Sequence, residues 1–487
     1  MFDFTIIGLG YVALGIVLTL DILLTKHRPV SAVLWLAVVW AFPYGGALAY
    51  LSVGIDRVRR GAAERDAAKL MVAQHARLHA TSDEHGIDYQ RGDRAVVHAH
   101  PARHIFRATD PAVQPFRISA GNAAELLVDG DKFYPALFAA IKTARSSIHL
   151  QTFILARGQV GSELMKLLIG RAREGVECRV LYDRFGSMLS HFTGFFDEAK
   201  EAGVQVRSIS QANPLKGRFQ INLRNHRKIV VIDGKQSFVG GINIQDKNTS
   251  RHADETPIRD YHVRIEGPAV SDLQFQFVED WHFATRESPD RLLDVRYFPR
   301  VQPAGDALVQ VVPGGPELRG RGLADAFFGA IVAATRFIDI VTPYFVPDET
   351  IVQAIRHAAI KGIQVRIVVP RKSNHWYTGQ AARSLYTPLL KAGVRIFERK
   401  PPFMHAKAMI IDGVYAMVGS ANLDQRSLHL NFELNVEVAD DPFVRRLGDQ
   451  IEAEIANSIE VILSVHQRRP IVRRLTENFC YLFQPML

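Results

Sequence analysis

The chain has 487 residues, of which 47% are hydrophobic and 22% are charged, so it can bury a large core and has a globular composition. Its two cysteines, Cys178 and Cys480, are too few and too far apart to make a disulfide framework or a zinc site. The net charge of +9 favours a polyanionic partner, which is either a nucleic acid or an anionic membrane surface.

Two apolar runs dominate the first sixty residues. Residues 5–24 carry a single acid, Asp21, and residues 30–53 carry no charge. Each run is long enough to cross about 30 Å of hydrocarbon as a helix, so we expect a transmembrane helical hairpin over residues 1–56. Because Pro-Tyr-Gly-Gly at residues 43–46 interrupts the second run, a kinked or shallow re-entrant hairpin is the alternative.

Basic residues predict the orientation of this hairpin. Two lie in the turn between the apolar runs, and five more follow the second run within residues 57–69. Because basic flanks stay in the cytoplasm, we expect the large C-terminal part of the chain on that side. The acidic start of the chain argues against a cleaved signal peptide, which needs a basic first segment.

Beyond about residue 121 the chain alternates predicted helices and strands, and it does so twice. Residues 133–182 predict the order helix, strand, helix, strand, and residues 324–369 repeat it. Short words recur as well, since Ala-Gly-Val-Gln-Val at residues 202–206 matches Ala-Gly-Val-Arg-Ile at residues 392–396. Offsets that stay near 180–190 residues indicate an internal duplication, and the alternation predicts an α/β fold in each half.

Each half carries one His-x-Lys-x-x-x-x-Asp motif followed by a short strand that ends in asparagine. The residues are His226, Lys228, Asp233 and Asn243 in the first half, and His405, Lys407, Asp412 and Asn422 in the second. The histidine and lysine are two positions apart at the start of a strand, so their side chains share a face. The aspartate precedes a glycine, and Asp-Gly is typical of a hairpin turn.

These residue types suit the exchange of a phosphodiester bond. Two lysines and two asparagine amides supply four donors that stabilise the charge on phosphorus without a metal or another cofactor. One imidazole attacks phosphorus and forms a phosphohistidine, while the other protonates the leaving alkoxide and then deprotonates the incoming alcohol. The motif aspartates lie at turns, which favours a role in structure and charge balance over proton transfer.

Asp260 and Glu433 stand at corresponding places after the two motifs, each inside an apolar, strand-like run. An acid in such a run is costly unless it is paired. We expect these carboxylates to orient the two motif histidines by holding one ring nitrogen of each. An ordinary buried ion pair is the alternative.

The paired motifs resemble the phospholipase D superfamily over about residues 121–446. Further features narrow the resemblance to the bacterial cardiolipin synthases. They are the N-terminal hairpin, residues 224–233, Thr-Pro-Tyr-Phe-Val-Pro at 342–347, Gly-Ser-Ala-Asn-Leu-Asp at 419–424, and Asn-Phe-Glu at 431–433. The resemblance implies a duplicated phospholipase D-like domain in which two α/β halves share one active site.

The same resemblance implies a reaction and a location. Two phosphatidylglycerol molecules would be joined into cardiolipin with release of glycerol, at the bacterial inner membrane and with the catalytic part cytoplasmic. His226 would be the nucleophile and His405 the acid and base. Residues 374–376 (Asn-His-Trp) are expected to shape the acceptor site. A hydrolytic phospholipase D and a nuclease are the alternatives, although the membrane hairpin argues against nucleic acid as a partner, and the oligomeric state is not predicted.

The end of the chain predicts a basic amphipathic helix. Apolar residues recur at helical spacing after a cluster of arginines; they are Ile471, Val472, Leu475, Phe479, Leu482 and Phe483. Such a helix is typical of binding to an anionic membrane surface, and packing on the protein's own core is the alternative. The expected organisation is a hairpin, a juxtamembrane linker, two α/β halves and a basic tail, over residues 1–56, 57–120, 121–295, 296–465 and 466–487.

Overall fold

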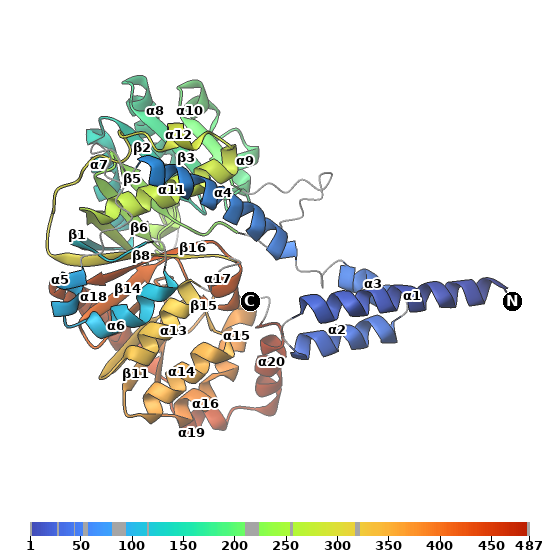
Figure 1. Cartoon of the computed structure of the whole chain (residues 1–487). Coiled ribbons are helices and arrows are strands. Elements are labelled where there is room, and N and C mark those ends of the chain that lie inside the picture. The colour runs from blue at the N-terminus through green and yellow to red at the C-terminus, as the bar shows by residue number, and fades with distance from the viewer. Residues whose placement is uncertain are drawn as a thin grey trace. The chain divides into compact units, whose positions relative to one another are not determined.

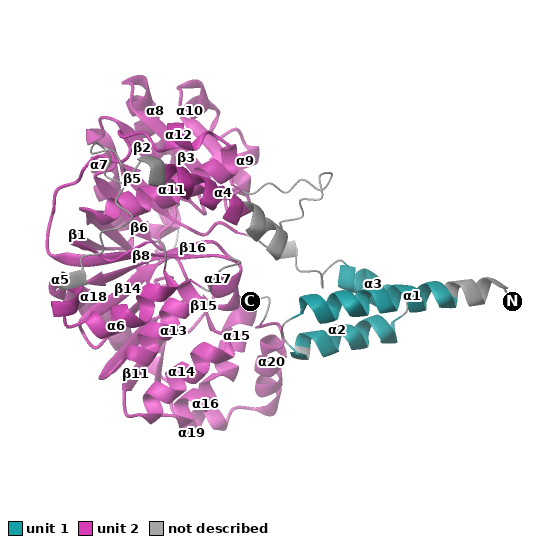
Figure 2. Cartoon of the chain, viewed as in Figure 1, with its two compact units in different colours: residues 1–61 teal, residues 62–487 magenta. Residues whose placement is uncertain are grey.

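The structure is a computed structural model. It describes residues 2–26, 29–42, 44–51, 57–79, 94–113, 116–209, 224–253, 257–316 and 322–484. The chain forms two compact units, Met1–Gly61 and Ala62–Leu487, which Figure 2 shows in different colours. The two related halves therefore do not separate into domains, because both belong to the second unit.

The first unit contains α1 (Phe2–Thr25), α2 (Pro29–Ala41) and α3 (Gly45–Ala49). Within the described residues, α1 is the one helix long and apolar enough to cross a membrane, over Gly8–Thr25. Its acid, Asp21, accepts a hydrogen bond of 2.5 Å from the hydroxyl of Tyr50, which satisfies a charge that would otherwise be costly among apolar residues.

The second predicted span is corrected by the structure. Residues 30–53 do not form one membrane-length helix, since α2 ends at Ala41 and α3 begins only at Gly45. Tyr44, just before α3, has a φ of 55°, in the left-handed region that ends a helix. The Pro-Tyr-Gly-Gly sequence that interrupts the run is the physical reason, because proline cannot donate to a helical hydrogen bond.

The second unit is built on a 15-stranded sheet, counted over the described residues. The first half runs outward in the order β1 (Ser119–Val128), β7 (Tyr261–Glu266), β6 (Gln236–Gly240), β5 (Ile229–Ile232), β2 (Ser147–Thr152), β3 (Glu177–Tyr182) and β4 (Gln205–Ser208). The second half runs in the order β8 (Ala307–Gly314), β16 (Glu433–Ala439), β14 (Tyr415–Gly419), β13 (Ala408–Ile411), β9 (Phe337–Val341), β11 (Gln364–Pro370), β12 (Arg395–Arg399) and β17 (Ser458–Glu460). A separate two-stranded sheet joins β10 (Phe345–Val346) to β15 (Leu423–Asp424).

Apart from β17, the two strand orders match position by position on either side of the antiparallel pair β1 and β8. Figure 1 shows the two halves meeting at these two strands. The predicted duplication is therefore confirmed as two α/β halves fused edge to edge in one sheet. Central strands such as β5 are buried along their whole length, which explains why they appear in the sequence as continuous apolar runs.

Helices cover both faces of this sheet. In the first half they are α7 (Asp129–Thr143), α8 (Gln159–Arg173), α9 (Met188–Phe192), α10 (Asp197–Glu201), α11 (Ala269–Thr285) and α12 (Pro289–Leu292). In the second half they are α13 (Leu323–Ala333), α14 (Glu349–Ile360), α15 (Trp376–Ser384), α16 (Tyr386–Lys391), α17 (Gln425–His429), α18 (Asp441–Ala456), α19 (Leu463–Gln467) and α20 (Ile471–Tyr481). Short 3₁₀ turns occupy Asp110–Ala112 and Asp246–Asn248.

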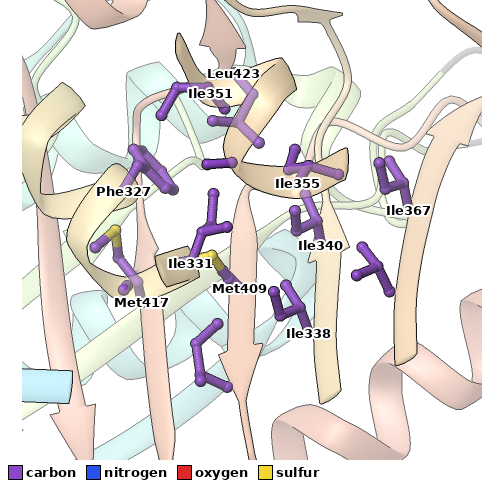
Figure 3. Packing of buried hydrophobic residues seen from close by; sticks show 14 of the residues in the cluster. Phe327, Ile331, Ile338, Ile340, Ile351, Ile355, Ile367, Met409, Met417 and Leu423 are labelled. Atoms are coloured by element: carbon purple, nitrogen blue, oxygen red, sulfur yellow. The ribbon is translucent and has the colours of Figure 1, made fainter. Parts of the chain in front are cut away.

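Among the described residues, the apolar core of the second unit has three parts. Helices α7 and α8 bury one face of the first half with residues such as Leu137 and Leu164. Helices α13 and α14 bury the corresponding face of the second half, where Ile331 and Ile355 pack over the strands (Figure 3). Helices α11 and α18 join both halves in one shared core. The halves are thus held together by a continuous apolar layer as well as by strand pairing.

Residues 57–120, expected as a linker, contribute to these cores. The segment forms α4 (Arg57–His79), α5 (Arg94–Ala99) and α6 (Arg103–Thr109). Val72 of α4 is fully buried in the shared core, and Ile105 and Phe106 of α6 are fully buried against α13. The described residues of α4 and α6 that belong to the second unit are therefore packed into its core.

Candidate active site

The two motif histidines lie at the same edge of the sheet. His226 precedes β5, which runs antiparallel to β2, with Gln151 opposite Ile229. His405 precedes β13, which runs antiparallel to β9. Both histidines therefore lie beyond the carboxyl ends of the parallel strands, which is where open α/β sheets form their ligand sites.

Backbone hydrogen bonds cross between the halves at this edge. The amide of His226 donates to the carbonyl of Phe432 over 2.8 Å, and the amide of His405 donates to the carbonyl of Arg259 over 2.7 Å. Phe432 and Arg259 each stand immediately before one of the two predicted orienting acids. Each histidine segment is thus joined to the segment that carries the acid of the opposite half.

The side chains cross in the same way. Nδ1 of His226 lies 2.9 Å from Oε2 of Glu433, and Nδ1 of His405 lies 2.6 Å from Oδ2 of Asp260. Both carboxylates are fully buried, whereas the imidazoles keep a small exposed fraction. The structure therefore brings the four predicted residues together, with each acid serving the histidine of the other half.

Glu433 is held as a carboxylate by several donors. Ser420 donates to its Oε2 over 2.6 Å, and Ser427 donates to its Oε1 over 2.9 Å. Burial raises the pKa of Glu433, but the attraction of His226 and Lys228 outweighs burial and holds that pKa below its usual value. The pKa of Asp260 is likewise low, because Lys407 and His405 outweigh its burial. Both acids are therefore charged at neutral pH.

The two motif lysines are buried beside the histidines. The ammonium of Lys228 donates to the carbonyl of His226 over 2.7 Å, and Lys407 bonds to the carbonyl of His405 in the same way. Burial lowers the pKa of Lys228 to about 7, with repulsion from Lys407 adding to the effect despite the attraction of Glu433. Burial also lowers the pKa of Lys407 to about 8. Two crowded, desolvated ammonium groups of this kind favour an anion between them.

The two motif asparagines are not equivalent. Asn243 accepts a hydrogen bond from the amide of Ile154 through its side-chain oxygen (3.1 Å), which leaves its NH₂ group as a donor. Asn422 donates its NH₂ group to the hydroxyl of Ser427 (3.1 Å), and its side-chain oxygen is buried without a partner among the described residues. The geometry thus fits a substrate-facing donor better at Asn243 than at Asn422.

The motif aspartates lie at the opposite ends of their strands from the histidines. Asp233, with a φ of 52°, accepts from the amides of Ser146 (2.7 Å) and Ser147 (2.9 Å) and so fixes the start of β2. Asp412, with a φ of 55°, accepts from the amides of Arg336 and Phe337 at the start of β9 in the same way. The structure does not bring either aspartate to the histidines, although both appear in the motifs as candidate catalytic residues.

Sequence reasoning missed a buried ion cluster behind His226. Arg227, the residue between His226 and Lys228, donates to both oxygens of Asp280 over 2.8 and 2.9 Å and to the carbonyl of Glu433 over 2.9 Å. Arg65 of α4 also pairs with Asp280, and its guanidinium lies 3.5 Å from the ring centroid of Phe432. The one available signal was the arginine at 227, where the second motif has an alanine.

Aromatic side chains frame the two imidazoles. The ring of Phe153 lies 4.9 Å from that of His226, and the ring of Tyr344 lies 6.4 Å from that of His405. The hydroxyl of Tyr344 donates to Asn374 over 2.6 Å. The segment expected to shape the acceptor site, residues 374–376, is therefore connected to His405 through a single side chain, that of Tyr344.

Comparison with known proteins identifies the family. A family profile described as "Cardiolipin synthase, PLD-like domain" matches residues 137–281 and 328–455, and one described as "Phospholipase_D-nuclease N-terminal" matches residues 13–54. The cardiolipin synthase of Geobacillus kaustophilus is 34% identical over 482 residues, which cover 97% of this chain and 92% of that protein. Cardiolipin synthase A of Pseudomonas fluorescens is 34% identical over 475 residues, covering 97% of this chain and 96% of the relative.

The fold has a solved counterpart as well. The crystal structure of phosphatidylserine synthase from Haemophilus influenzae covers 79% of this chain and all of its own, with a TM-score of 0.59 and 15% sequence identity. At that identity the likeness concerns the fold alone. The near-complete matches to the curated relatives, together with the two-part profile match over the duplicated halves, show that the chain belongs to the cardiolipin synthase family of phospholipase D-like proteins.

Proposed function

We propose that the protein transfers a phosphatidyl group from one phosphatidylglycerol to a second, which gives cardiolipin and releases glycerol. The observation that carries the proposal is the crossed pair of His–carboxylate contacts beside two buried lysines, in a chain whose relatives are named cardiolipin synthases. The N-terminal apolar helix supports a membrane protein. We also propose that the catalytic unit lies in the cytoplasm, because basic residues follow the apolar segment.

The first step forms a covalent intermediate. Glu433 holds Nδ1–H of His226, so Nε2 carries the lone pair that attacks phosphorus. The bond from phosphorus to the glycerol oxygen breaks, and His405 gives that oxygen a proton. Lys228, Lys407 and the amide of Asn243 stabilise the charge that builds on the phosphoryl oxygens.

The second step reverses these roles. His405, now neutral, takes the proton from the free hydroxyl of the acceptor phosphatidylglycerol. The resulting alkoxide attacks phosphorus, and the bond from phosphorus to His226 breaks. Asp260 stabilises the imidazolium of His405 in each half-reaction.

The protonation of His405 depends on whether substrate is bound. Without substrate, burial lowers the pKa of His405 to about 4, and the neighbouring ammonium of Lys407 adds to this against the pull of Asp260. A bound phosphodiester anion offsets the charge of the lysines and so raises the pKa of His405 towards the proton it must donate. Acid catalysis is thereby available only when a phosphodiester occupies the site.

Product analysis tests the proposed function. Purified protein in detergent is given phosphatidylglycerol alone, and the expected products are cardiolipin and glycerol in equal amounts. A hydrolytic phospholipase D is the second candidate, because the same site with water as acceptor would give phosphatidic acid. Phosphatidic acid without cardiolipin would therefore overturn the transferase proposal.

The alkaline side of the pH profile depends on the two lysines. Both must be charged to bind the donor, and their pKa values of about 7 and about 8 in the free enzyme mean that charge is lost as pH rises through that range. Because Lys228 loses its charge first, we expect kcat/KM to fall as pH rises above about 7. In Lys228→Arg, whose guanidinium stays charged, the decline should begin only near the pKa of Lys407, about 8; an unchanged profile in that variant would contradict the assignment.

Neutral replacements of Glu433 and Asp260 test whether each acid orients the histidine of the opposite half. Glu433→Gln or Asp260→Asn keeps the shape of each side chain but removes the charge that fixes the tautomer of the paired histidine, so kcat should fall about 10²- to 10⁴-fold. With phosphatidyl-p-nitrophenol, whose leaving group needs no proton, Glu433→Gln should slow formation of the phosphoenzyme on His226, whereas Asp260→Asn should slow only its transfer to the acceptor alcohol. Rapid-quench measurement of the phosphoenzyme with this donor distinguishes the two. Equally slow phosphoenzyme formation in both variants would rule out the crossed assignment.

A further inference from the structure

Each half exposes large apolar side chains at the edge of the sheet that carries the histidines. In the first half they follow β3 and belong to α9 and the turn before it; they are Phe185, Met188, Leu189 and Phe192, each more than half exposed. In the second half Trp376 and Tyr377 begin α15, which follows β11. Because β3 and β11 are parallel to β2 and β9, both groups lie beyond the carboxyl ends of the strands.

Helix α20 extends this apolar surface. It packs beside α15, as Figure 1 also shows, and it turns Glu477 and Cys480 inward, where both are buried. The apolar residues of α20 and of the two positions after it are exposed instead, with exposed fractions of 46% to 73% at Ile471, Val472, Leu475, Phe479, Leu482 and Phe483. The alternative of a helix that buries its apolar face on the protein's own core is therefore excluded within the described residues.

The exposed groups are connected to the active site. The hydroxyl of Ser187, at the start of α9, donates to the carbonyl of Phe153 over 3.1 Å, and Phe153 is the ring beside His226. In the second half Asn374, just before α15, accepts from Tyr344, the ring beside His405. The apolar surface is thus the rim of the site, one side chain away from each imidazole.

Positive charge accompanies this rim. Four arginines precede or begin α20, and they are Arg468, Arg469, Arg473 and Arg474. The acid on this helix, Glu477, is fully buried and paired with Arg469 (2.6 Å) and Arg473 (3.3 Å), so it does not present a carboxylate to the solvent. An apolar surface flanked by arginines complements an anionic lipid surface, whereas a second copy of the chain would bring the same positive charge to the contact.

We infer that α9, the start of α15 and α20 form one docking surface, the rim surface, which seats the mouth of the active site on an anionic bilayer. The inference rests on the proposed function in one respect, since a lipid substrate explains why the rim of the site is the part that binds the membrane. Apolar side chains on such a docking surface enter the headgroup region of the bilayer, where the phosphodiester of a phospholipid lies. Donor and acceptor lipids then reach the two histidines without leaving the interface.

Fluorescent labels on the full-length chain test the rim surface. In a background with Cys178→Ala and Cys480→Ala, which removes both free buried thiols, a single cysteine is placed at Leu189 or Leu475 and labelled with an environment-sensitive fluorophore. The matched control is Ile360, which is equally exposed but lies at the end of α14, just before the amino end of β11 and so at the opposite edge of the sheet. The protein is reconstituted into phosphatidylglycerol-containing vesicles with and without lipids that carry a doxyl quencher.

We expect doxyl quenching at Leu189 and Leu475 to exceed that at Ile360 by at least about threefold, with a blue-shifted emission. Equal quenching at all three positions would overturn the inference. A blue shift at Leu475 without doxyl quenching would overturn it too, because protein rather than lipid would then cover α20. The result must be the same in a His405→Ala background, since docking needs no turnover, so a failure of the proposed function cannot be mistaken for a failure of the rim surface.

Discussion

Alanine at His226 or at His405 is expected to lower phosphatidyl transfer by more than about 10⁴-fold, but for different reasons. Without His226 there is no nucleophile to take the phosphatidyl group. Without His405 the glycerol alkoxide leaves without a proton and the acceptor hydroxyl keeps its own. Transfer measured with natural phosphatidylglycerol therefore does not tell the two defects apart.

A substrate with a better leaving group separates them. Phosphatidyl-p-nitrophenol releases its phenolate without needing a proton, so His405→Ala should still show a burst of about one equivalent of p-nitrophenol per enzyme and then stall. The phosphatidyl group should remain on the protein in a bond that acid cleaves and base does not, as expected for phosphohistidine. His226→Ala should show no burst.

The control is His357→Ala, which removes an exposed histidine on α14 and should leave transfer unchanged. A burst in His226→Ala together with none in His405→Ala would reverse the roles of the two imidazoles. A burst in both variants would remove the covalent intermediate from the proposed mechanism.

Replacement of Asp280 by asparagine is expected to destabilise the second unit by about 3–5 kcal/mol, because it leaves two buried guanidinium groups without their common acid. Asp280 is fully buried between Arg227 and Arg65, and Gln151 also donates to it over 2.6 Å. Burial raises the pKa of Asp280, but the two arginines outweigh burial and hold the pKa well below its usual range. The stability that the charged form contributes is therefore present above the unfolded pKa of about 4 and is lost as pH falls through the lower folded value.

The midpoint of urea unfolding measures this cost. The matched control is Asp197→Asn, which removes an acid from the exposed pair with Lys200 (3.0 Å) and should cost no more than about 0.5 kcal/mol. Asp280→Asn should also slow the chemistry, because Arg227 links Asp280 to the carbonyl of Glu433. Equal midpoints for Asp280→Asn and Asp197→Asn would show that the buried cluster contributes nothing measurable.

Most of the fold follows from local pattern. The order helix, strand, helix, strand expected over residues 133–182 is found as α7, β2, α8 and β3. Continuous apolar runs and repeated turn words are properties of neighbouring residues, so the sequence is sufficient to predict them. The prediction of a second membrane-length helix was wrong for a related reason. Hydropathy is averaged over a window of residues, so it takes no account of a single proline that ends a helix.

Contacts between residues far apart in the sequence could not be predicted from it. Asp260 and Glu433 were predicted as acids near histidines, but which acid meets which histidine depends on the pairing of segments about 145 and 207 residues apart. The outward face of α20 is a similar case, because the same amphipathic pattern serves a core helix and a surface helix. Arg65 had no local signal at all, since its partner is 215 residues away.

The crossed pairs also bear on when the protein becomes competent during its own synthesis. The first half has a complete motif, yet His226 takes its carboxylate from Glu433, near the end of the second half. A nascent chain that stops short of that residue holds a nucleophile whose imidazole has no fixed tautomer. On the proposed mechanism, a half-made protein already held at its membrane would therefore not cleave the lipids around it before the acceptor side of the site exists.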